Sequence, residues 1–215
     1  MASETGLRER KKRQTRQLLA DTARRLFAER GFENVSVAEI ARAADVSEAT
    51  VFNYFPTKED LVYIGLEAFE SELLRAVRER PAGEAVIDAF ARFVLAQRGL
   101  LAARDEQSAK ELLSVGRMIA ASPALLAREE QIFARYTRAL ARLIADELHA
   151  SEGDLRPYVT ASALIGVHRA LLDYVREQLK SESLDRERLS RELRRRGHAA
   201  LELLRRGIGS YAPKR

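Results

Sequence analysis

The amino-acid sequence predicts an all-α fold of about nine helices. Of its 215 residues, 46% are hydrophobic and 32% are charged, while only 11 are Gly and 5 are Pro, so few positions force the chain out of regular structure. Ala, Leu, Arg and Glu dominate the composition, which favours helix. Apolar residues recur at helical spacing, and no segment alternates as a strand would. We therefore expect a small N-terminal helical domain at residues 1–60 and a larger helical domain at residues 61–215.

The first helix is expected at residues 7–30. Leu19, Ala23 and Phe27 are spaced four residues apart and form one apolar stripe. Gly31 follows a basic last turn, and a glycine at that position is a typical stop signal. The stripe and the stop signal together define a helix of several turns with one buried face.

Two short helices are expected next, at residues 37–44 and 48–54. Ser36 precedes the first of them, and Glu39 three residues later completes a capping-box pattern. Ser47 is a suitable N-cap for the second. Two short helices joined by a tight turn form a helix-turn-helix, whose second helix enters the major groove of DNA. The same spacing would also fit an ordinary three-helix unit that binds no DNA.

Hydrogen-bonding side chains share one side of the second short helix. Val51 and Phe55 are four residues apart and are expected to face the core. Thr50, Asn53 and Tyr54 lie elsewhere on the helix surface. Polar side chains of this kind are what base readout in a groove requires.

A long fourth helix is expected at residues 58–80, with Thr57 as its cap and the Pro-Ala-Gly sequence of positions 81–83 as its end. The other segments are also expected to be helical, at residues 84–104, 106–121, 123–149, 154–180 and 184–207.

The charge balance is compatible with a nucleic-acid partner. The net charge is +5, and six basic residues and one acid lie between positions 8 and 16. This basic N-terminal stretch is either a solvated arm or an arm that follows the DNA backbone or enters the minor groove. The first 14 residues lack the apolar core of a signal peptide, and no apolar run approaches the ~20 residues of a membrane helix. We expect a soluble, cytoplasmic protein with no membrane partner.

Residues 18–61 carry a dense motif across the proposed helix-turn-helix. It includes the stretches Leu26-Phe27-Ala28-Glu29-Arg30-Gly31-Phe32, Val35-Ser36-Val37-Ala38-Glu39-Ile40-Ala41 and Thr50-Val51-Phe52-Asn53-Tyr54-Phe55-Pro56-Thr57-Lys58. This motif resembles the N-terminal domain of the TetR family of transcriptional regulators. The resemblance implies a sequence-specific DNA-binding regulator, and we expect a repressor that a small molecule releases from a palindromic operator.

The resemblance also implies which residues contact DNA. Asn53 matches a base-contacting position. Phe52 stands where many members have a Tyr that reaches a phosphate, and Ala38 stands where some have a base-reading Arg, so Arg42 is the cation left to the first short helix. The expected DNA-binding residues are Ser36, Arg42, Ser47, Glu48, Ala49, Thr50, Asn53, Tyr54 and Lys58.

The last two helices carry heavy apolar faces. In the family that the motif resembles, the corresponding helices pair with their copies, so we expect a homodimer through residues 154–207. Packing within the subunit alone would give the same periodicity. A dimer fits a palindromic operator, because one short recognition helix supplies little specificity. The faces consist of Leu155, Tyr158, Val159, Ser162, Ile165, Leu172, Val175 and Leu179 on the first helix and Leu189, Leu193, Ala200, Leu203 and Leu204 on the second.

The middle helices resemble the family's ligand chamber. Aromatic and aliphatic residues there predict a site for a small, largely apolar effector, with Arg117 as an anionic anchor. Taken singly, each of these residues would also fit plain core or surface. The candidates are Phe69, Phe90, Phe93, Arg117, Met118, Phe133, Tyr136, His168 and Leu172.

Enzymatic function is not expected. The three His residues are far apart in the sequence, and no HExxH helix, GxSxG elbow or Gly-rich phosphate loop is present. The chain has no Cys, which excludes thiolate metal sites, and we expect no cofactor. An architectural protein that binds DNA without sequence preference is the other alternative.

Overall fold

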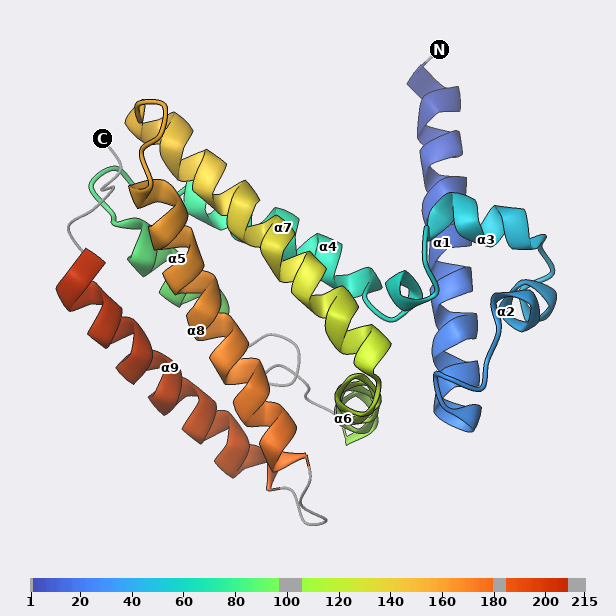
Figure 1. Ribbon diagram of the computed structural model, residues 1–215. Coiled ribbons are helices and arrows are strands. Elements are labelled where there is room, and N and C mark those ends of the chain that lie inside the picture. Colours follow the sequence, from blue (N-terminus) through green and yellow to red (C-terminus); the bar gives the residue numbers. More distant parts are fainter. Residues whose placement is uncertain (1, 97–105, 180–184, 209–215) are drawn as a thin grey trace. The chain divides into compact units, whose positions relative to one another are not determined.

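The computed structural model describes residues 2–96, 106–179 and 185–208, and these form nine α-helices and one 3₁₀ turn with no strand (Figure 1). The predicted all-α class is therefore confirmed. The helices are α1 (Ala2–Arg30), α2 (Val37–Ala43), α3 (Glu48–Tyr54), the 3₁₀ turn η1 (Glu59–Leu61), α4 (Ile64–Arg78), α5 (Val86–Val94), α6 (Glu106–Ala121), α7 (Pro123–Leu148), α8 (Arg156–Gln178) and α9 (Arg186–Ile208). No helix in this part of the chain is both long and apolar enough to cross a membrane.

The chain divides into two compact units. The first comprises Met1–Glu67 together with Met118–Arg128, and the second comprises Ala68–Arg117 together with Glu129–Arg215. The sequence placed a boundary at residue 60 and did not anticipate that the corner between α6 and α7 belongs with the N-terminal helices. Helices α6 and α7 each begin in one unit and end in the other.

In the first unit, α2 packs against both α1 and α3 (Figure 1). The apolar stripe of α1 is buried as expected, since Leu19 is fully buried and Phe27 nearly so. Gly31 ends the helix with a φ of +81°, a conformation that costs a glycine little, and its N–H donates to Phe27 O at 2.8 Å.

The expected fourth helix at residues 58–80 is wrong at its start. A 3₁₀ turn precedes α4, which begins only at Ile64. The cause is a set of contacts with the α6–α7 corner. Asp60 accepts from Arg128 at 2.7–2.8 Å, and the Tyr63 hydroxyl donates to Leu125 O at 2.8 Å. These residues are more than 60 positions apart, so local sequence could not reveal the interruption.

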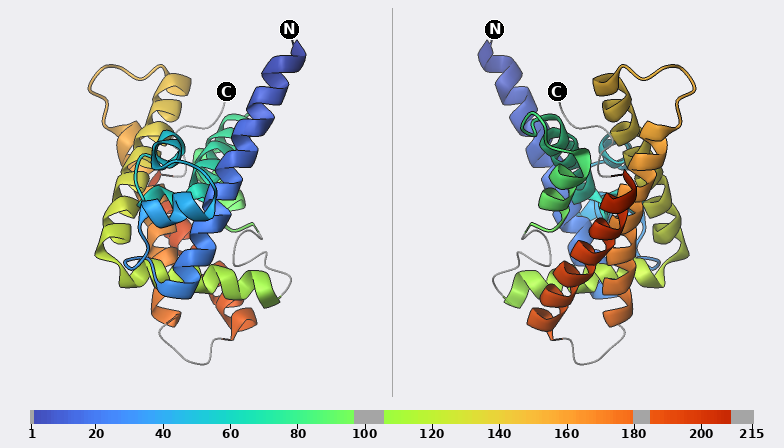
Figure 2. Two further views of the ribbon diagram at one scale, coloured as in Figure 1. Left: turned by 90° about the vertical axis from the view of Figure 1, so that its right-hand side faces the viewer. Right: turned by 90° about the vertical axis from the view of Figure 1, so that its left-hand side faces the viewer.

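The second unit is built around α8, which packs against both α5 and α9 (Figure 2, right, orange and red for α8 and α9). Gly197 of α9 permits a close approach, because a Cβ there would lie 2.4 Å from a methyl of Leu95 and 3.3 Å from one of Leu171. Arg80 is 2% exposed and forms an ion pair with Glu147 of α7 at 2.7 Å. Its guanidinium also donates to the carbonyl oxygens of Val77 and Glu84.

The expected helix at residues 84–104 is also shorter than predicted. Helix α5 ends at Val94, with Leu95 as its C-cap, and residues 97–105 lie outside the described part of the chain. Residues 180–184, within the expected dimer region, likewise lie outside it. The remaining helix bounds agree with expectation within two residues, except that α1 begins at Ala2, before the expected start at residue 7.

Candidate nucleic-acid interface

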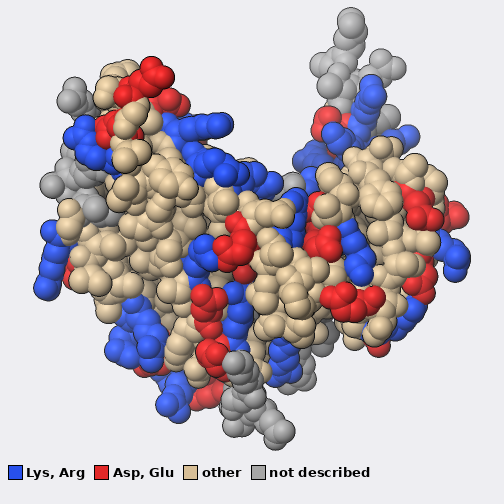
Figure 3. Space-filling view, viewed as in Figure 1, with Lys and Arg blue, Asp and Glu red and all other residues tan. Residues whose placement is uncertain are grey.

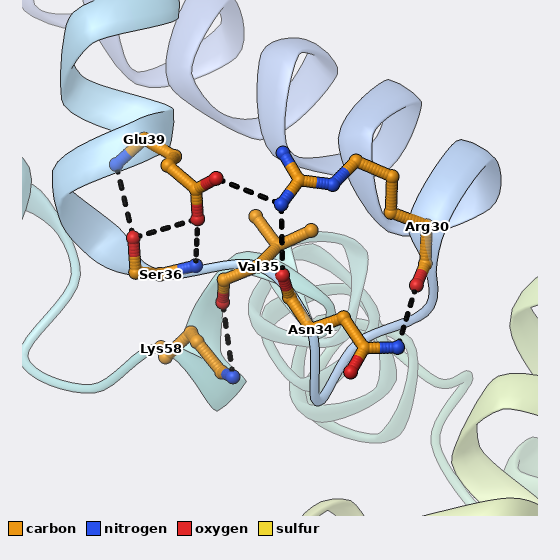
Figure 4. Close-up of polar contacts among 6 residues, drawn as sticks. All are labelled: Arg30, Asn34, Val35, Ser36, Glu39 and Lys58. Carbon is orange, nitrogen blue, oxygen red and sulfur yellow. Dashed lines mark hydrogen bonds and ion pairs between the residues drawn. The ribbon is translucent and has the colours of Figure 1, made fainter.

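A capping box fixes the start of α2, as the sequence predicted. The Ser36 hydroxyl accepts from the backbone N–H of Glu39 at 3.2 Å, and the Glu39 carboxylate accepts from the backbone N–H of Ser36 at 2.8 Å (Figure 4). Arg30 also donates to Glu39 at 2.7 Å and to Asn34 O at 3.0 Å. The bonds from Ser36, with a smaller contribution from Arg30, lower the pKa of Glu39 to about 2. The carboxylate therefore stays charged and fixes the entry of the chain into α2.

Lys58 holds the same loop from the other side. Its ammonium donates to Val35 O at 3.2 Å (Figure 4). It also donates to Phe32 O at 3.0 Å and lies 4.0 Å from the centre of the Phe32 ring. Two of its three N–H donors are therefore used within the chain. The role that the geometry gives Lys58 is to close the loop before Ser36, and its expected DNA contact stays a prediction.

The turn between α2 and α3 is tight. Asp45 adopts a φ of +54°, which Asp tolerates better than most residues, and the N–H of Val46 donates to Ala41 O at 3.0 Å. Ser47 then caps α3, because its hydroxyl accepts from the N–H of Thr50 at 3.1 Å. The Thr50 hydroxyl is engaged locally as well, at 2.8 Å from the Ser47 hydroxyl. Both the backbone N–H and the hydroxyl of Thr50 therefore belong to the N-cap of α3.

One side of α3 is buried. Val51 and Phe55 are each 1% exposed, as the sequence predicted, and the guanidinium of Arg16 lies 5.2 Å from the centre of the Phe55 ring. Thr50 and Tyr54 are half-buried at the flank. The helix is thus held to the first unit by its two apolar residues, and its other side is left open.

The open side of α3 consists of Glu48, Ala49, Phe52 and Asn53, all exposed. Their positions follow the i, i+4 spacing of one helix face. Sequence reasoning grouped Asn53 with Thr50 and Tyr54 and left Phe52 out of the expected site. The spacing of positions 48, 49, 52 and 53 opposite Val51 was the signal that could have included it.

Part of the expected contact set surrounds an open hollow of about 510 Å³ between α2 and the start of α3. Arg42 is exposed at its edge and supplies a cation beside the acids Asp45 and Glu48. The hollow brings together three expected DNA-binding residues from both short helices. Its lining is Ala38, Ala41, Arg42, Asp45, Val46, Ser47 and Glu48.

The basic N-terminal stretch is helical, in agreement with the first helix expected from residue 7, and its contact with DNA stays a prediction. It forms the first turns of α1, where Figure 3 shows blue side chains gathered below the grey residues. Five of the six basic side chains are exposed, and Arg16 is half-buried against Phe55. At about 100° per residue, these successive positions point to several sides of the helix. The exposed basic side chains are Arg8, Arg10, Lys11, Lys12 and Arg13.

In the second unit, five of the nine expected ligand-binding residues lie together. The Phe69 ring contacts those of Phe93, Tyr136 and His168, with centroids 5.1, 6.4 and 4.8 Å away. Phe133 meets Tyr136 at 5.9 Å and His168 at 5.7 Å. We call these five residues the aromatic cluster.

His168 is the polar member of the aromatic cluster. It is 9% exposed, and burial lowers its pKa to about 4, so the imidazole is neutral near pH 7. Its Nδ1 atom is buried and has no hydrogen-bond partner in the described part of the chain. A buried polar atom of this kind costs free energy until something bonds to it.

The other expected ligand residues are dispersed. Phe90 is fully buried on α5, Leu172 is half-buried, and Arg117 is exposed on α6. Met118 belongs to the first unit. No described group of three or more His, Asp or Glu side chains could hold a metal ion.

Two cations that the sequence did not single out lie over rings of the aromatic cluster. Arg135 stands 5.7 Å from the Tyr136 ring and pairs with Glu70, and Arg169 stands 5.6 Å from the Phe133 ring. No local signal distinguishes these arginines from the other charged residues of α7 and α8. The place of Arg169 depends on how α7 and α8 pack, whereas Arg135 is next to Tyr136 on α7.

The expected dimer faces divide into buried and exposed parts. Leu189 and Leu193 are 3% and 6% exposed and pack within the subunit, so their assignment to a dimer surface is wrong. Ile165 and Leu179 are also buried. The exposed apolar residues are Leu155, Tyr158, Val159 and Leu203, which are between 52% and 72% exposed.

Comparison with known proteins places the first unit in a regulatory family. Residues 19–63 match the model for bacterial regulatory proteins of the tetR family. The transcriptional regulator TcmR of Streptomyces glaucescens is 30% identical over 172 residues, which are 77% of this chain and 75% of TcmR. The regulator LuxR of Vibrio harveyi is 55% identical over 47 residues, 22% of this chain and 23% of LuxR.

Solved structures support the same fold. A TetR-family regulator from Streptomyces coelicolor has a TM-score of 0.51 at 23% identity, with 87% of this chain and 94% of that one covered. The SmeT–triclosan complex has a TM-score of 0.54 at 14% identity, with 90% of each chain covered. With its helix-turn-helix, its all-α fold and a relative that matches three quarters of its length, the chain belongs to the TetR family of transcriptional regulators, which are DNA-binding proteins and not enzymes.

Proposed function

We propose that this protein is a sequence-specific repressor that binds a palindromic operator as a homodimer and leaves it when a small, largely apolar molecule binds. The observation that carries the DNA-binding part is the open side of α3, with Asn53 exposed and Val51 and Phe55 anchored in the core. Asn can bond both the N6 and N7 atoms of adenine. As a bacterial regulator of transcription, the protein would act in the cytoplasm, where the chromosome lies.

Selection of DNA fragments from the source genome by the purified protein tests this proposal. We expect an inverted repeat to be enriched and to resist competition by bulk DNA. Asn53→Ala should change the preferred bases without lowering thermal stability, because Asn53 is exposed. Equal competition by bulk DNA would instead indicate an architectural protein and contradict the proposal.

An exposed stripe on α8 supports a dimer through residues 154–207. Leu155, Tyr158 and Val159 begin this stripe, and the small residues Gly166 and Ala170 continue it, all exposed. Among the described residues, no atom outside the adjoining backbone of α8 and the two neighbours of Gly166 lies within 4 Å of a Cβ built there. Small residues at this spacing allow two helices to approach closely, so the stripe suits a second copy of α8.

Gly166→Arg tests the dimer face without disturbing the subunit, since the added side chain has open space in the monomer. We expect the variant to keep its helical content and to sediment as a monomer. Ala28→Arg is the control, because Ala28 is exposed on α1 in the first unit, outside residues 154–207. A Gly166→Arg protein that remains dimeric would contradict this interface.

The aromatic cluster supports an effector with an aromatic body and one hydrogen-bonding group. The cluster offers ring faces, and the buried Nδ1 of His168 offers a single polar partner. A protein of this fold is known in complex with triclosan. The rings are in mutual contact in this structure, so an effector would have to separate Phe69 from His168.

The route from effector to DNA follows the α6–α7 corner. The interruption at η1 removes the single rigid helix from Lys58 onward that the sequence predicted. The corner is instead fastened to the DNA-binding unit by the Tyr63–Leu125 and Asp60–Arg128 contacts. A shift of α7 in the second unit would therefore be transmitted to the residues that follow the recognition helix.

The effector proposal is tested by titrating the operator complex with triclosan and a panel of substituted phenols. We expect at least one compound to lower DNA affinity, and DNA to weaken its binding by the same factor. His168→Leu should bind the operator normally and lose the response. An operator complex that none of the compounds dissociates would contradict this part.

A further inference from the structure

Phe52 is a large apolar side chain on the open side of α3. It is 47% exposed, whereas Val51 just before it and Phe55 three residues after it are buried. Single exposed apolar residues are common on protein surfaces, so exposure alone carries no conclusion. The position of Phe52 is more informative, because it lies one helical turn after Glu48 and beside Asn53 on the surface that the recognition helix leaves free.

The chemistry of a phenyl ring limits what Phe52 can contact in DNA. It has no donor or acceptor, so it cannot bond a phosphate oxygen or a base edge. The apolar feature of the major groove is the C5 methyl group of thymine, and Phe and Ala side chains make apolar contacts with it. Ala49, three residues before Phe52, is also exposed, so the two form an apolar patch between the polar side chains of Glu48 and Asn53.

We propose that Phe52 is a specificity-determining residue that recognises a thymine methyl group in each half of the operator. Asn53 beside it would bond adenine in the same stretch of groove, so the pair favours A·T base pairs through two different chemistries. The ring is already solvent-exposed on a capped, anchored helix, and the contact needs no rearrangement of the first unit. This inference rests on the proposed function, since it requires a specific operator.

Replacing thymine by deoxyuridine tests the inference directly, because the change removes only the methyl group. With the selected operator, we expect one symmetric pair of substitutions to weaken wild-type binding about 15-fold. This corresponds to about fourfold per half-site, the value of one buried carbon. Phe52→Ala should bind the thymine and deoxyuridine operators equally. Phe52→Tyr keeps the ring and should keep the dependence on the methyl group.

The control is Leu18→Ala. Leu18 is exposed to a similar extent, 50%, but lies on α1, so its removal should leave the ratio of the two affinities unchanged. Wild-type affinity that is the same for every deoxyuridine substitution would overturn the inference, as would a Phe52→Ala variant with undiminished methyl dependence. Either result leaves the proposed function intact if the operator is still preferred over bulk DNA. Failure to select any operator would overturn both.

Discussion

The helix-turn-helix of the first unit and the interior of the second unit are stabilised by different kinds of contact. In the first, the caps of α2 and α3 are formed by residues three positions apart, Ser36 with Glu39 and Ser47 with Thr50. In the second, the polar and aromatic contacts join distant residues, such as Arg80 with Glu147 and Phe69 with His168. Local contacts near the surface leave the open side of α3 exposed to solvent. Distant buried contacts instead make the second unit sensitive to changes in its interior.

The largest effect is expected from Arg80→Met. The variant leaves Glu147 without its cation and removes the donors to Val77 O and Glu84 O. We expect the free energy of unfolding to fall by about 3 kcal/mol or more, measured by urea denaturation. Arg25→Met is the control, because Arg25 pairs with Glu29 on the surface and such pairs contribute less than about 0.5 kcal/mol. An equal fall in the free energy of unfolding for the two variants would contradict the expected difference between the buried and the surface ion pair.

A pH dependence of stability is expected from His168. Its folded-state pKa of about 4 lies below its ordinary value of 6.5, so between these pH values the unfolded chain binds the proton and the folded chain does not. The free energy of unfolding therefore has its full value above pH 6.5. It falls by up to about 3 kcal/mol as the pH falls towards 4.

Comparison of wild type with His168→Leu isolates the effect of His168 on stability, because the carboxylates titrate in both proteins. The difference in unfolding free energy between them should change across pH 6.5 to 4 and level off below that range. His149→Gln, which removes an exposed His, should follow the wild type. A difference independent of pH would mean that His168 is protonated in the folded protein.

A smaller effect is expected from Ser36→Ala in the first unit. Loss of the N-cap should cost about 1 kcal/mol, whereas Ser36→Gly should cost only a few tenths. Thermal unfolding of both variants measures the difference. A loss as large as that of Arg80→Met would show that the helix-turn-helix also depends on distant contacts through this position.

The smallest effect on stability is expected from Arg42→Ala, because Arg42 is exposed at the edge of the hollow. Its effect should appear in DNA binding, where the slope of affinity against salt falls by about one for each phosphate that the protein no longer neutralises. Lys58→Ala should differ by lowering stability as well, since its ammonium closes the loop before Ser36. An unchanged salt slope for Arg42→Ala would show that Arg42 does not neutralise a DNA phosphate.

The features that the sequence predicted correctly are those decided by nearby residues. Most of the helix bounds, the capping box at Ser36 and the buried pair Val51 and Phe55 follow from spacing of four residues or fewer. The interruption after Leu61 depends on contacts of Asp60 and Tyr63 with Arg128 and Leu125. Each pair is more than 60 positions apart in the sequence. That is why the predicted fourth helix was too long.

The errors in the second unit have a similar cause. Periodicity identifies an apolar face but not what covers it, so Leu193, which is buried within the subunit, was assigned with Leu203 to a dimer surface. Arg169 of α8 was missed because only the packing of α7 and α8 brings it over the Phe133 ring. Arg135, by contrast, is the sequence neighbour of Tyr136 on α7. Phe52 is different, since helical spacing alone could have placed it beside Asn53.

The central claim is that two copies of α3 read the two halves of one operator. The most direct test measures stoichiometry and affinity on the selected palindrome and on the same DNA with one half scrambled. We expect two chains per palindrome, with half-sites centred about 34–36 Å or a multiple apart along the DNA, and an affinity loss of at least 100-fold when one half is scrambled. One chain bound per palindrome, or equal affinity for the intact and half-scrambled DNA, would contradict the account.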